Sequence, residues 1–573
     1  MDTPAVRCPW TDQQAPRRGG PIGAVGEVLR VPDVRRIELG WGLSVIGELA
    51  GTVSLVVYAF GEGGATLVAA YAVSRTAAGI GVGLLFTGVG DRVRRDRLLR
   101  LITGLRAVLL ASAALVAAQG GPSVGVIALA AASSAFSGTY RPLQAAILPW
   151  LVRTPAGLTA SNVTAAMMEN AGALIGPVLA GALVAVADAP TAIAMAAGFL
   201  GLATLAVRRL AVPAGRMAAD DHHPHVLREV AEGIAAFVRL APPGGIAILV
   251  VAQALVRGAL TVLIAVLAVD VLALGDAAVG WLTAALGVGG LVGGLVAASV
   301  VHATRLGRSF VVGVFLWGLP LTVLALVPTP AMAYVALVVV GIGNAVEDIG
   351  AFTLIARLAS PRVVGRVLAA TELLVLVGVC VGSVVAPPLL DTLGMSGTLG
   401  LLGGGLAALA LGHSARFGRL DRTMPTPGPG LELMRSLPMF APLSLAVTEL
   451  VATELRPHHF PAGSVVIREG ETGDEFHLVC DGSAAVSVRG TSRPPLARGD
   501  YFGEIALLRD VPRTATITAT EPLNTLSLGR SEFLAAVTGN SVSGAAAEAV
   551  VIRRLTEDPP GGTPDEPQPP ESP

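Results

Sequence analysis

Two short motifs near the C-terminus contain residue types that bind phosphate. The motif GEIALL begins at Gly503 and places Glu504 at the start of a short predicted helix. The first N–H groups of such a helix, and the positive end of its dipole, attract an anion. The second motif, PRTATITA, contains Arg513, whose guanidinium can form two charge-assisted hydrogen bonds with phosphate oxygens. Together the motifs predict a phosphate-binding site.

The segment that carries these motifs alternates in hydrophobicity over strand-length runs. Runs such as DEFHLVCDG, SAAVSVRG and NTLSLGR are separated by Gly, Pro and Asp, which is typical of short antiparallel strands joined by tight turns. The preceding run, from Leu431, has the spacing of two or three helices. The pattern predicts a small β-roll flanked by helices.

This segment, 431–556, resembles the cyclic-nucleotide-binding domain, and GEIALL with PRTATITA resembles that family's phosphate-binding cassette. The strand and turn positions that carry the resemblance are Phe460, Ala462, Gly463, Ile467, Gly470, Gly473, Asp474, Gly482 and Val486. The glycines fit because tight turns in a roll need positive φ.

The resemblance implies a role for each residue of the cassette. Glu504 would accept the ribose 2′-hydroxyl and Arg513 would bind the cyclic phosphate. Thr514 would contact the phosphate or a guanine amino group, and the latter would favour cGMP. The implied ligand is cAMP or cGMP, with no covalent cofactor and no metal, and a helix near 543–555 would cover the base. The backbone of the remaining cassette residues completes the cradle: Gly503, Ile505, Ala506 and Ala515.

The composition of the whole chain predicts a different environment for the rest of it. Of the 573 residues, 53% are hydrophobic and 14% are charged, whereas a soluble globular protein has about 25% charged residues. This deficit predicts a polytopic α-helical membrane protein with the lipid bilayer as its first partner. The net charge of -1 gives no reason to expect nucleic acid as a partner.

Twelve apolar runs are long enough to cross a bilayer, which takes about 20 residues each. Loops with Arg alternate with loops without it, and Arg-rich loops stay cytoplasmic. We therefore expect a multi-pass protein of the plasma membrane with both termini in the cytoplasm. The expected spans are 37–60, 66–88, 97–118, 122–148, 158–187, 189–206, 244–273, 278–301, 307–327, 330–357, 362–389 and 394–413.

The two sets of six spans form an internal repeat. GALIGPVLAG in the fifth span matches GVCVGSVVAPP in the eleventh, and DRVRRDR after the second span matches TRLGRS after the eighth. Two similar halves around a central site are the architecture of alternating-access transporters. On these residues the segment 35–415 resembles the major facilitator superfamily, including its drug-exporting and siderophore-exporting branch.

Two motifs carry that resemblance. The family's cytoplasmic loop motif GxxxDRxGRR is matched in part by Asp91, Arg92 and Arg95, which could latch one conformational state or simply hold the loop inside. The antiporter motif GxxxGPxxGG implies export in exchange for protons, although ordinary close helix packing gives the same pattern. It is matched by Gly172, Gly176, Pro177 and Gly181.

Charged side chains within spans are costly in lipid and usually functional. We expect Glu48 and Glu372 to be the best candidates for proton coupling, because each lies well inside its span. Some of the others could be structural ion pairs. The further candidates for transport or coupling are Arg75, Arg106, Glu169, Arg257, Glu347 and Asp348.

The expected organisation has seven parts. Two six-helix bundles are joined by a cytoplasmic loop and followed by a linker, the nucleotide-binding domain and an acidic, proline-rich tail. The parts are 1–36 (N-terminal segment), 37–206 and 244–413 (bundles), 207–243 (central loop), 414–430 (linker), 431–556 (domain) and 557–573 (tail).

The sequence as a whole predicts a proton-coupled exporter of a small molecule, regulated by a cyclic nucleotide. Two alternatives stay open: a transporter whose C-terminal domain only docks or oligomerises, and a membrane receptor that moves nothing. A cyclic-nucleotide-gated channel is disfavoured because the chain has no TVGYG-type filter and no arginine ladder. An enzyme is disfavoured because the soluble parts have no nucleophile and base in a recognisable pattern.

Overall fold

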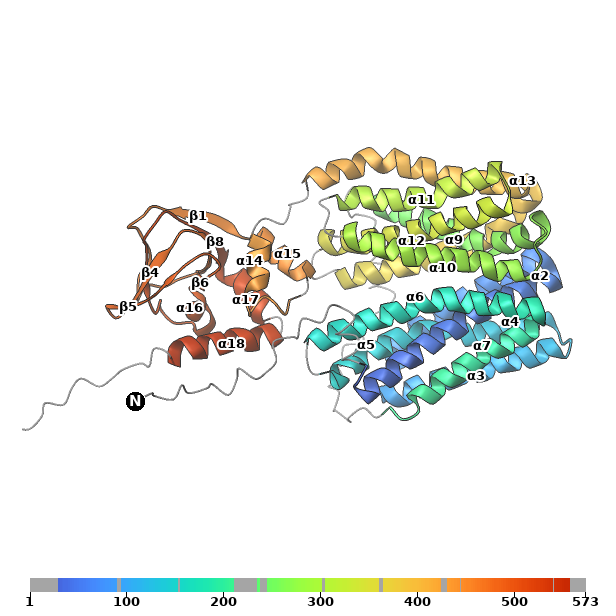
Figure 1. Ribbon diagram of the computed structural model, residues 1–573, viewed down its shortest axis with the longest axis horizontal. Helices are drawn as coiled ribbons and strands as arrows, with labels where there is room; N and C mark the ends of the chain where they lie inside the picture. The colour runs from blue at the N-terminus through green and yellow to red at the C-terminus, as the bar shows by residue number, and fades with distance from the viewer. Residues whose placement is uncertain are drawn as a thin grey trace, which may run out of the picture. The chain divides into compact units, whose positions relative to one another are not determined.

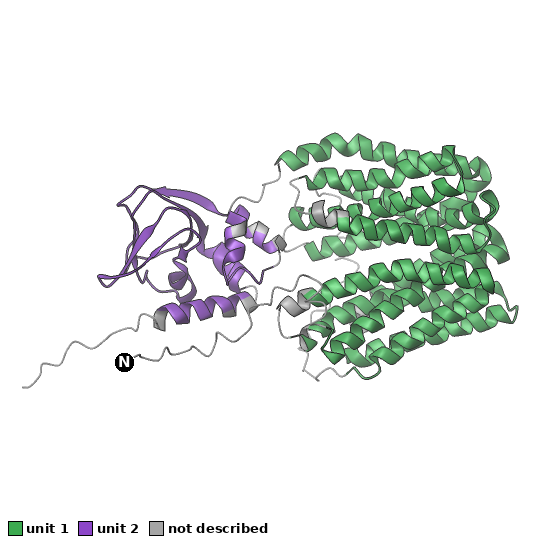
Figure 2. Cartoon of the chain, viewed as in Figure 1, with its two compact units in different colours: residues 1–422 green, residues 423–573 purple. Residues whose placement is uncertain are grey.

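The computed structural model divides the chain into two compact units, residues 1–422 and residues 423–573 (Figure 2). We call them the helical unit and the roll unit. The structure describes residues 29–89, 94–152, 155–210, 234–235, 237, 245–300, 305–359, 364–423, 430–443, 445–538 and 541–556.

The helical unit consists of long helices connected by short segments (Figure 1). A 3₁₀ turn, η1 (Ser137–Thr139), lies between α4 and α5, and a π-helical turn, η2 (Leu267–Val271), extends α9. The helices are α2 (Pro32–Val89), α3 (Arg95–Ala118), α4 (Ser123–Ala135), α5 (Tyr140–Leu151), α6 (Pro155–Val186), α7 (Ala189–Val207), α9 (Gly245–Val266), α10 (Ala277–Val300), α11 (Leu306–Leu326), α12 (Pro330–Leu358) and α13 (Val364–Thr423).

Ten stretches of the described chain are long and apolar enough to cross a membrane. Two of them lie in α2 and α13, which have 58 and 60 residues and contain non-helical backbone at Gly63–Gly64 and at Gly394. Gly64 (φ 60°) and Gly394 (φ 67°) adopt positive φ, which costs glycine little. Gly64 lies between two expected spans and Gly394 is the first residue of the last expected span, so each of these helices has the length of two expected spans.

The expected span 122–148 is interrupted rather than continuous. α4 ends at Ala135, and η1 separates it from α5. Arg106 from α3 donates its Nε–H to the Ser133 carbonyl (3.2 Å), and the Ser133 hydroxyl donates to the Arg106 carbonyl (2.9 Å). A buried arginine therefore fixes the chain one turn before the break, a feature that hydrophobicity alone does not reveal.

The last helix of the helical unit continues into the segment 414–430 that was expected to be a linker. α13 ends at Thr423, so only 424–429 lie between it and the next helix. Asp421 near its end accepts hydrogen bonds from the backbone N–H groups of Gly307 (2.7 Å) and Arg308 (3.0 Å) at the start of α11. A carboxylate at a helix N-terminus is favourable, which explains why this charged segment remains helical.

The glycines of the antiporter-like motif lie where helices approach closely. A Cβ on Gly172 or Gly176 would press on residues 45–50 of α2, and one on Gly181 would press on Gly280 of α10. Pro177 lies inside α6 next to these contacts.

The second half of the unit repeats this packing. Gly378 and Gly382 of α13 meet Ala254 and Leu255 of α9 in the same way as the α6 glycines meet α2. The internal repeat seen in the sequence is therefore also a repeat of helix contacts, in which small residues let backbones touch.

Within the residues that the structure describes, the roll unit contains eight strands and five helices. Its helices are α14 (Gly430–Ser436), α15 (Leu445–Thr453), α16 (Glu504–Arg509), α17 (Arg530–Thr538) and α18 (Ser541–Thr556). Its strands are β1 (Arg456–Phe460), β2 (Val465–Ile467), β3 (Glu475–Asp481), β4 (Ala484–Val488), β5 (Thr491–Leu496), β6 (Tyr501–Phe502), β7 (Thr516–Ala519) and β8 (Leu523–Gly529).

The strands form two four-stranded antiparallel sheets, in the orders β1-β8-β3-β6 and β2-β7-β4-β5. Val479, Phe502 and Ile517 belong to a buried cluster inside the roll. A second cluster, which includes Phe440, Phe476 and Phe533, packs the flanking helices on the first sheet. The expected β-roll with flanking helices is confirmed.

Strand β5 was not expected, because its sequence TSRPPL contains two prolines. Proline donates no hydrogen bond to a ladder and occurs in sheets mainly on edge strands. β5 is the last strand of its sheet and pairs only with β4, so one of its sides needs no partner. The tertiary position of the strand overrides its local propensity.

Candidate functional site

The two phosphate-binding motifs lie side by side in the roll unit. Gly503 precedes α16 with φ 91°, a conformation that side chains rarely adopt. A Cβ on Gly503 would also collide with the guanidinium of Arg513 and the carbonyl of Glu475. Glycine is therefore required here both for the turn into α16 and for the approach of Arg513.

The Arg513 side chain is buried, with 5% of its surface exposed. Its Nη1 donates to the Gly503 carbonyl (3.0 Å) and its Nη2 donates to the Glu475 carbonyl (2.7 Å). Its backbone is fixed as well, because Arg513 N–H donates to the Glu471 carbonyl (2.8 Å) and Gly470 N–H donates to the Arg513 carbonyl (2.8 Å). The guanidinium is therefore held beside the start of α16.

Glu504 is fully buried at the first position of α16. Its Oε1 accepts a hydrogen bond from Nη1 of Arg554 (2.7 Å), while its Oε2 has no partner among the described residues. Arg554 lies in α18, donates also to the Tyr501 carbonyl (3.1 Å), and lies over the Tyr501 ring. One carboxylate oxygen is thus occupied and the other retains its capacity to accept.

The other expected cassette residues surround this pair. Ala506 is buried, whereas Ile505, Thr514 and Ala515 are half-buried. α18, which covers the residues expected to form a lid, contacts α16 through the ion pair between Arg509 and Glu548. The structure therefore brings all seven expected cassette residues into one region of the roll unit.

Burial shapes the electrostatics of the cassette. It raises the pKa of Glu504, and the Arg554 guanidinium is the strongest influence opposing that rise. Burial also lowers the pKa of Arg513, and the negative charge of Glu504 opposes this lowering. His477 lies on β3 beneath the site, stacks on Phe502, and has its pKa lowered to about 3 by burial and by the charge of Arg513. The Arg513 guanidinium is therefore a cation that solvent hardly reaches, and a bound anion would stabilise its charge.

The acids expected to couple protons lie in the helical unit with different surroundings. Glu48 of α2 accepts from Nη2 of Arg106 (3.1 Å), whose side chain is 2% exposed. Glu169, Asp348 and Glu372 are exposed, and Asp348 accepts a hydrogen bond from the Asn344 amide (2.9 Å). Glu48 is thus already the partner of a buried arginine.

These acids come from α2, α6, α12 and α13, yet they interact electrostatically. Glu169 lies within range of Glu48 and Asp348, and Glu372 lies within range of Asp348 and Arg257. Glu347 is buried, with 3% of its surface exposed, and one of its carboxylate oxygens has no partner. The fold therefore brings acids from both halves of the helical unit together.

The loop motif after the second expected span is only partly visible. Asp91 and Arg92 lie outside the described residues, while Arg95 donates to the Ala146 carbonyl of α5 (3.0 Å). Asp96 is 2% exposed and is paired with Arg94 and Arg100, each at 3.1 Å. Asp96, the buried acid of this loop, is thus not one of the residues that match the motif.

Three features of the site escaped the sequence. Arg554 has no motif of its own, and only the packing of α18 on α16 brings it to Glu504. Glu475 takes part through its carbonyl, which any residue could supply. The sequence shows Arg75 and Arg257 as charges within spans. It does not show that both line one pocket of the helical unit.

Comparison with known proteins agrees with the geometry of the roll unit. Residues 457–540 match the family model of the cyclic nucleotide-binding domain. The chain is also similar to the cAMP-dependent protein kinase regulatory subunit of Eremothecium gossypii, at 43% identity over 103 residues, and to the cGMP-dependent protein kinase of Eimeria tenella, at 39% over 109 residues. The matches cover 18% and 19% of this chain, and 22% and 11% of those relatives. The chain thus carries a C-terminal cyclic nucleotide-binding domain.

The helical unit matches a solved structure in fold. The crystal structure of the nucleoside transporter NupG, in a mutant form, superposes with a TM-score of 0.56 at 14% identity, covering 67% of this chain and all of that one. At this identity the likeness concerns the arrangement of helices alone. The helical unit therefore shares its arrangement of helices with that structure.

Proposed function

We propose that this chain is a secondary active transporter of a small molecule, regulated by cAMP or cGMP bound to its roll unit. The observation that carries the proposal is the cassette itself: a buried Arg513 guanidinium beside α16 and a buried Glu504 with one unpartnered oxygen. A cyclic nucleotide offers a phosphate for the first and a ribose hydroxyl for the second. The cassette belongs to a chain whose other unit has a transporter-like fold.

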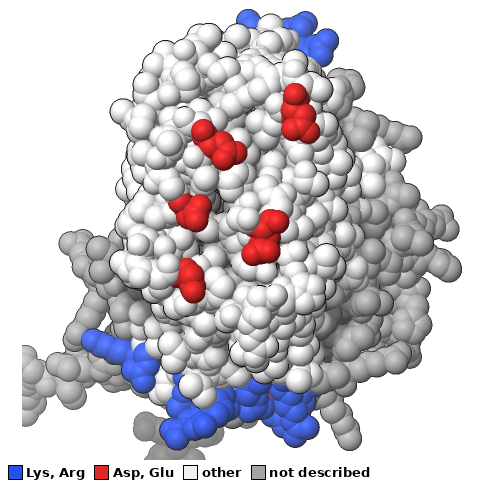
Figure 3. Space-filling model, turned by 90° about the vertical axis from the view of Figure 1, so that its right-hand side faces the viewer, with Lys and Arg blue, Asp and Glu red and all other residues white. Residues whose placement is uncertain are grey.

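The charge distribution of the helical unit supports an orientation for it. On the face shown in Figure 3, acidic side chains are scattered and the basic ones lie at the margin. Connections such as those at Glu62, Asp188 and Asp391 carry acids and no arginine, whereas the starts of α3 and α11 are rich in arginine. Since arginine-rich loops stay inside, both termini and the roll unit are cytoplasmic in this proposal, with twelve spans in the plasma membrane.

Proton-coupled efflux is the transport mode that we propose. The grouped acids Glu48, Glu169, Asp348 and Glu372 come from both halves, and a carboxylate shared between two halves can change its proton affinity as they move. The close contacts of Gly172, Gly176 and Gly181 support a tightly packed α6, as in the antiporter motif that this helix resembles.

The connection between the units supports coupling between them. Because α13 runs to Thr423, only 424–429 separate it from α14, instead of the expected 17-residue linker. A shorter tether raises the effective concentration of the roll unit at the helical unit. Nucleotide binding would then bias the conformational equilibrium by about 1–3 kcal/mol, or roughly five- to 150-fold.

Calorimetric titration of the purified full-length protein with cAMP and cGMP tests this proposal. We expect saturable binding that is about a hundredfold weaker in Arg513→Ala, since a charge-assisted hydrogen bond contributes about 1.5–3 kcal/mol. Arg513→Lys keeps the charge but loses the paired geometry, and should bind with intermediate affinity. Arg468→Ala is the matched control, because Arg468 is exposed and its ion-pair partner among the described residues is the similarly exposed Glu471.

The melting temperature of each variant is measured in parallel. If neither nucleotide binds the folded wild type, the roll unit is a passive docking module and the regulatory proposal is wrong. Equal binding by Arg513→Lys, Arg513→Ala and the wild type would show that the ligand does not lie on Arg513.

A further inference from the structure

The helical unit encloses a pocket of about 270 Å³ between its two halves. α2 contributes residues on both sides of its Gly63–Gly64 kink, and each of the helices α9 to α13 contributes at least one residue. Ligand pockets in proteins are typically about 300–1,000 Å³, so this cavity suits a small metabolite. Its position between the halves is where an alternating-access carrier holds its substrate.

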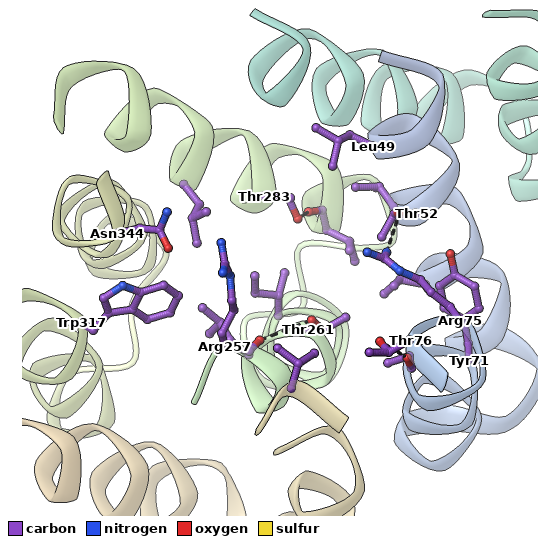
Figure 4. Close-up of a pocket in the computed structure, with 18 residues that line it drawn as sticks. Leu49, Thr52, Tyr71, Arg75, Thr76, Arg257, Thr261, Thr283, Trp317 and Asn344 are labelled. Carbon is purple, nitrogen blue, oxygen red and sulfur yellow. Dashed lines mark hydrogen bonds between the residues drawn. The ribbon is translucent and has the colours of Figure 1, made fainter. Parts of the chain in front are cut away.

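The charges lining this pocket are all positive. Its lining contains two arginines, Arg75 of α2 and Arg257 of α9, and no carboxylate. Nη1 of Arg75 donates to the Thr52 hydroxyl (2.9 Å), a neutral partner. The Arg257 guanidinium has no hydrogen bond or ion pair to any residue in the described part of the chain, and Figure 4 shows both side chains among the lining residues. The pocket thus holds two cationic groups that no lining acid neutralises.

The uncharged part of the lining also leaves hydrogen-bonding groups free. The Trp317 side chain is 1% exposed, and its Nε1–H has no partner among the described residues. The buried Tyr71 hydroxyl lies close to Arg75 without a hydrogen bond of good geometry. Buried donors without partners are costly. These groups, from α11 and α2, add to the surplus of donors that the arginines provide.

We propose that the pocket binds a small organic anion, through a carboxylate or phosphate held between Arg75 and Arg257. This inference rests on the proposed transport function and names the class of substrate. Guanidinium groups present several donors in a planar fork that matches oxyanions. The Trp317 ring and aliphatic residues such as Leu260 and Ile264 supply an apolar wall for the rest of the molecule.

The nearby acids do not change this assignment. Glu48 lies within electrostatic range of Arg75, and Glu347 and Glu372 lie within range of Arg257, but none of these acids lines the pocket. A cationic substrate would face two arginines and no carboxylate in the pocket lining. A neutral substrate would offer no opposite charge to Arg257, whose side chain is exposed.

Thermal melting of the purified full-length protein tests the charge preference. The probes are benzoate, salicylate and phenyl phosphate, with benzamide and salicylamide as neutral isosteres and benzylamine as the cation. We expect at least one anion at millimolar concentration to raise the melting temperature while its amide does not. In Arg257→Gln and in Arg75→Gln the apparent affinity should fall about tenfold or more.

Arg416→Gln is the matched control, because Arg416 is exposed near the end of α13 and does not line the pocket. It should keep the stabilisation seen in the wild type. Three outcomes would overturn the proposal: no stabilisation by any anion, stabilisation by the amide or amine alone, or full stabilisation of Arg257→Gln and Arg75→Gln by the anion.

Flux measurements separate this inference from the transport proposal. The anion that binds is then loaded into proteoliposomes containing the wild type. Binding without flux would contradict transport and leave the anion site standing. Flux of benzylamine or an amide, without binding of any anion, would leave transport standing and contradict the anion site.

Discussion

The contact between Arg554 and Glu504 gives the sharpest single test of the cassette. Arg554→Gln removes the only partner of Glu504 Oε1 in the described structure, at 2.7 Å, and leaves a fully buried carboxylate. Breaking a buried ion pair from one side costs about 3–5 kcal/mol. The Arg554 side chain is 29% exposed, so solvent screens part of this contact and we expect a loss of about 2 kcal/mol.

The same change should alter ligand binding and its pH dependence. Burial already raises the pKa of Glu504, and Arg554 opposes that rise, so without Arg554 the pKa rises further. A protonated Glu504 is a weaker acceptor for a ribose hydroxyl than a carboxylate. We expect nucleotide affinity to fall about tenfold on the acidic side of this raised pKa. It should recover as the pH rises through the raised pKa, because deprotonation restores the carboxylate.

Calorimetry between about pH 6 and about pH 9 measures both effects. Arg553→Gln is the control, because it makes the same change of charge at the adjacent, exposed position of α18. If Arg554→Gln binds nucleotide as tightly as the wild type over this range, Arg554 does not keep Glu504 charged. Equal losses in both variants would point to long-range charge rather than to the contact.

Two further predictions concern stability. His477 has its pKa lowered from 6.5 to about 3 in the folded roll unit, so only the unfolded chain takes up the proton as pH falls below 6.5. The free energy of unfolding should drop by about 2 kcal/mol from about pH 8 to about pH 5. Urea unfolding of residues 423–573 measures this drop. An equal drop in His477→Phe would show that His477 is not its cause. In the helical unit, Gly280→Val should lower the melting temperature, because a Cβ at this position would lie 2.7 Å from the Pro177 carbonyl oxygen. Gly294→Val should not lower it, because a Cβ at Gly294 would lie in open space. Equal melting of the two glycine variants would refute the close contact of α6 and α10.

Much of the fold is predictable from local sequence. The β-roll follows from alternating strands and glycine turns, and the long helices follow from apolar runs. The close helix contacts at Gly172 and Gly378 follow from a repeated pattern of small residues, whereas their partner helices α2 and α9 come from the structure. These features are predictable because each depends on residues close together in the chain or on a repeat.

The features that escaped prediction depend on tertiary context. The prolines of β5 are acceptable only because that strand lies at a sheet edge. α13 remains helical through its charged end because Asp421 caps α11, which is distant in sequence. Arg554 meets Glu504 only because α18 folds back on α16.

Hydrogen exchange of the full-length protein in lipid nanodiscs, with and without saturating cAMP or cGMP, tests the central claim that nucleotide in the roll unit controls the helical unit. We predict that a nucleotide that binds changes exchange in helices of residues 29–422, by roughly five- to 150-fold for the elements that move. The change should be absent in Arg513→Ala. Exchange that changes only within residues 423–556 would show that the domain binds its ligand without acting on the membrane fold, and would contradict the regulated transporter proposed here.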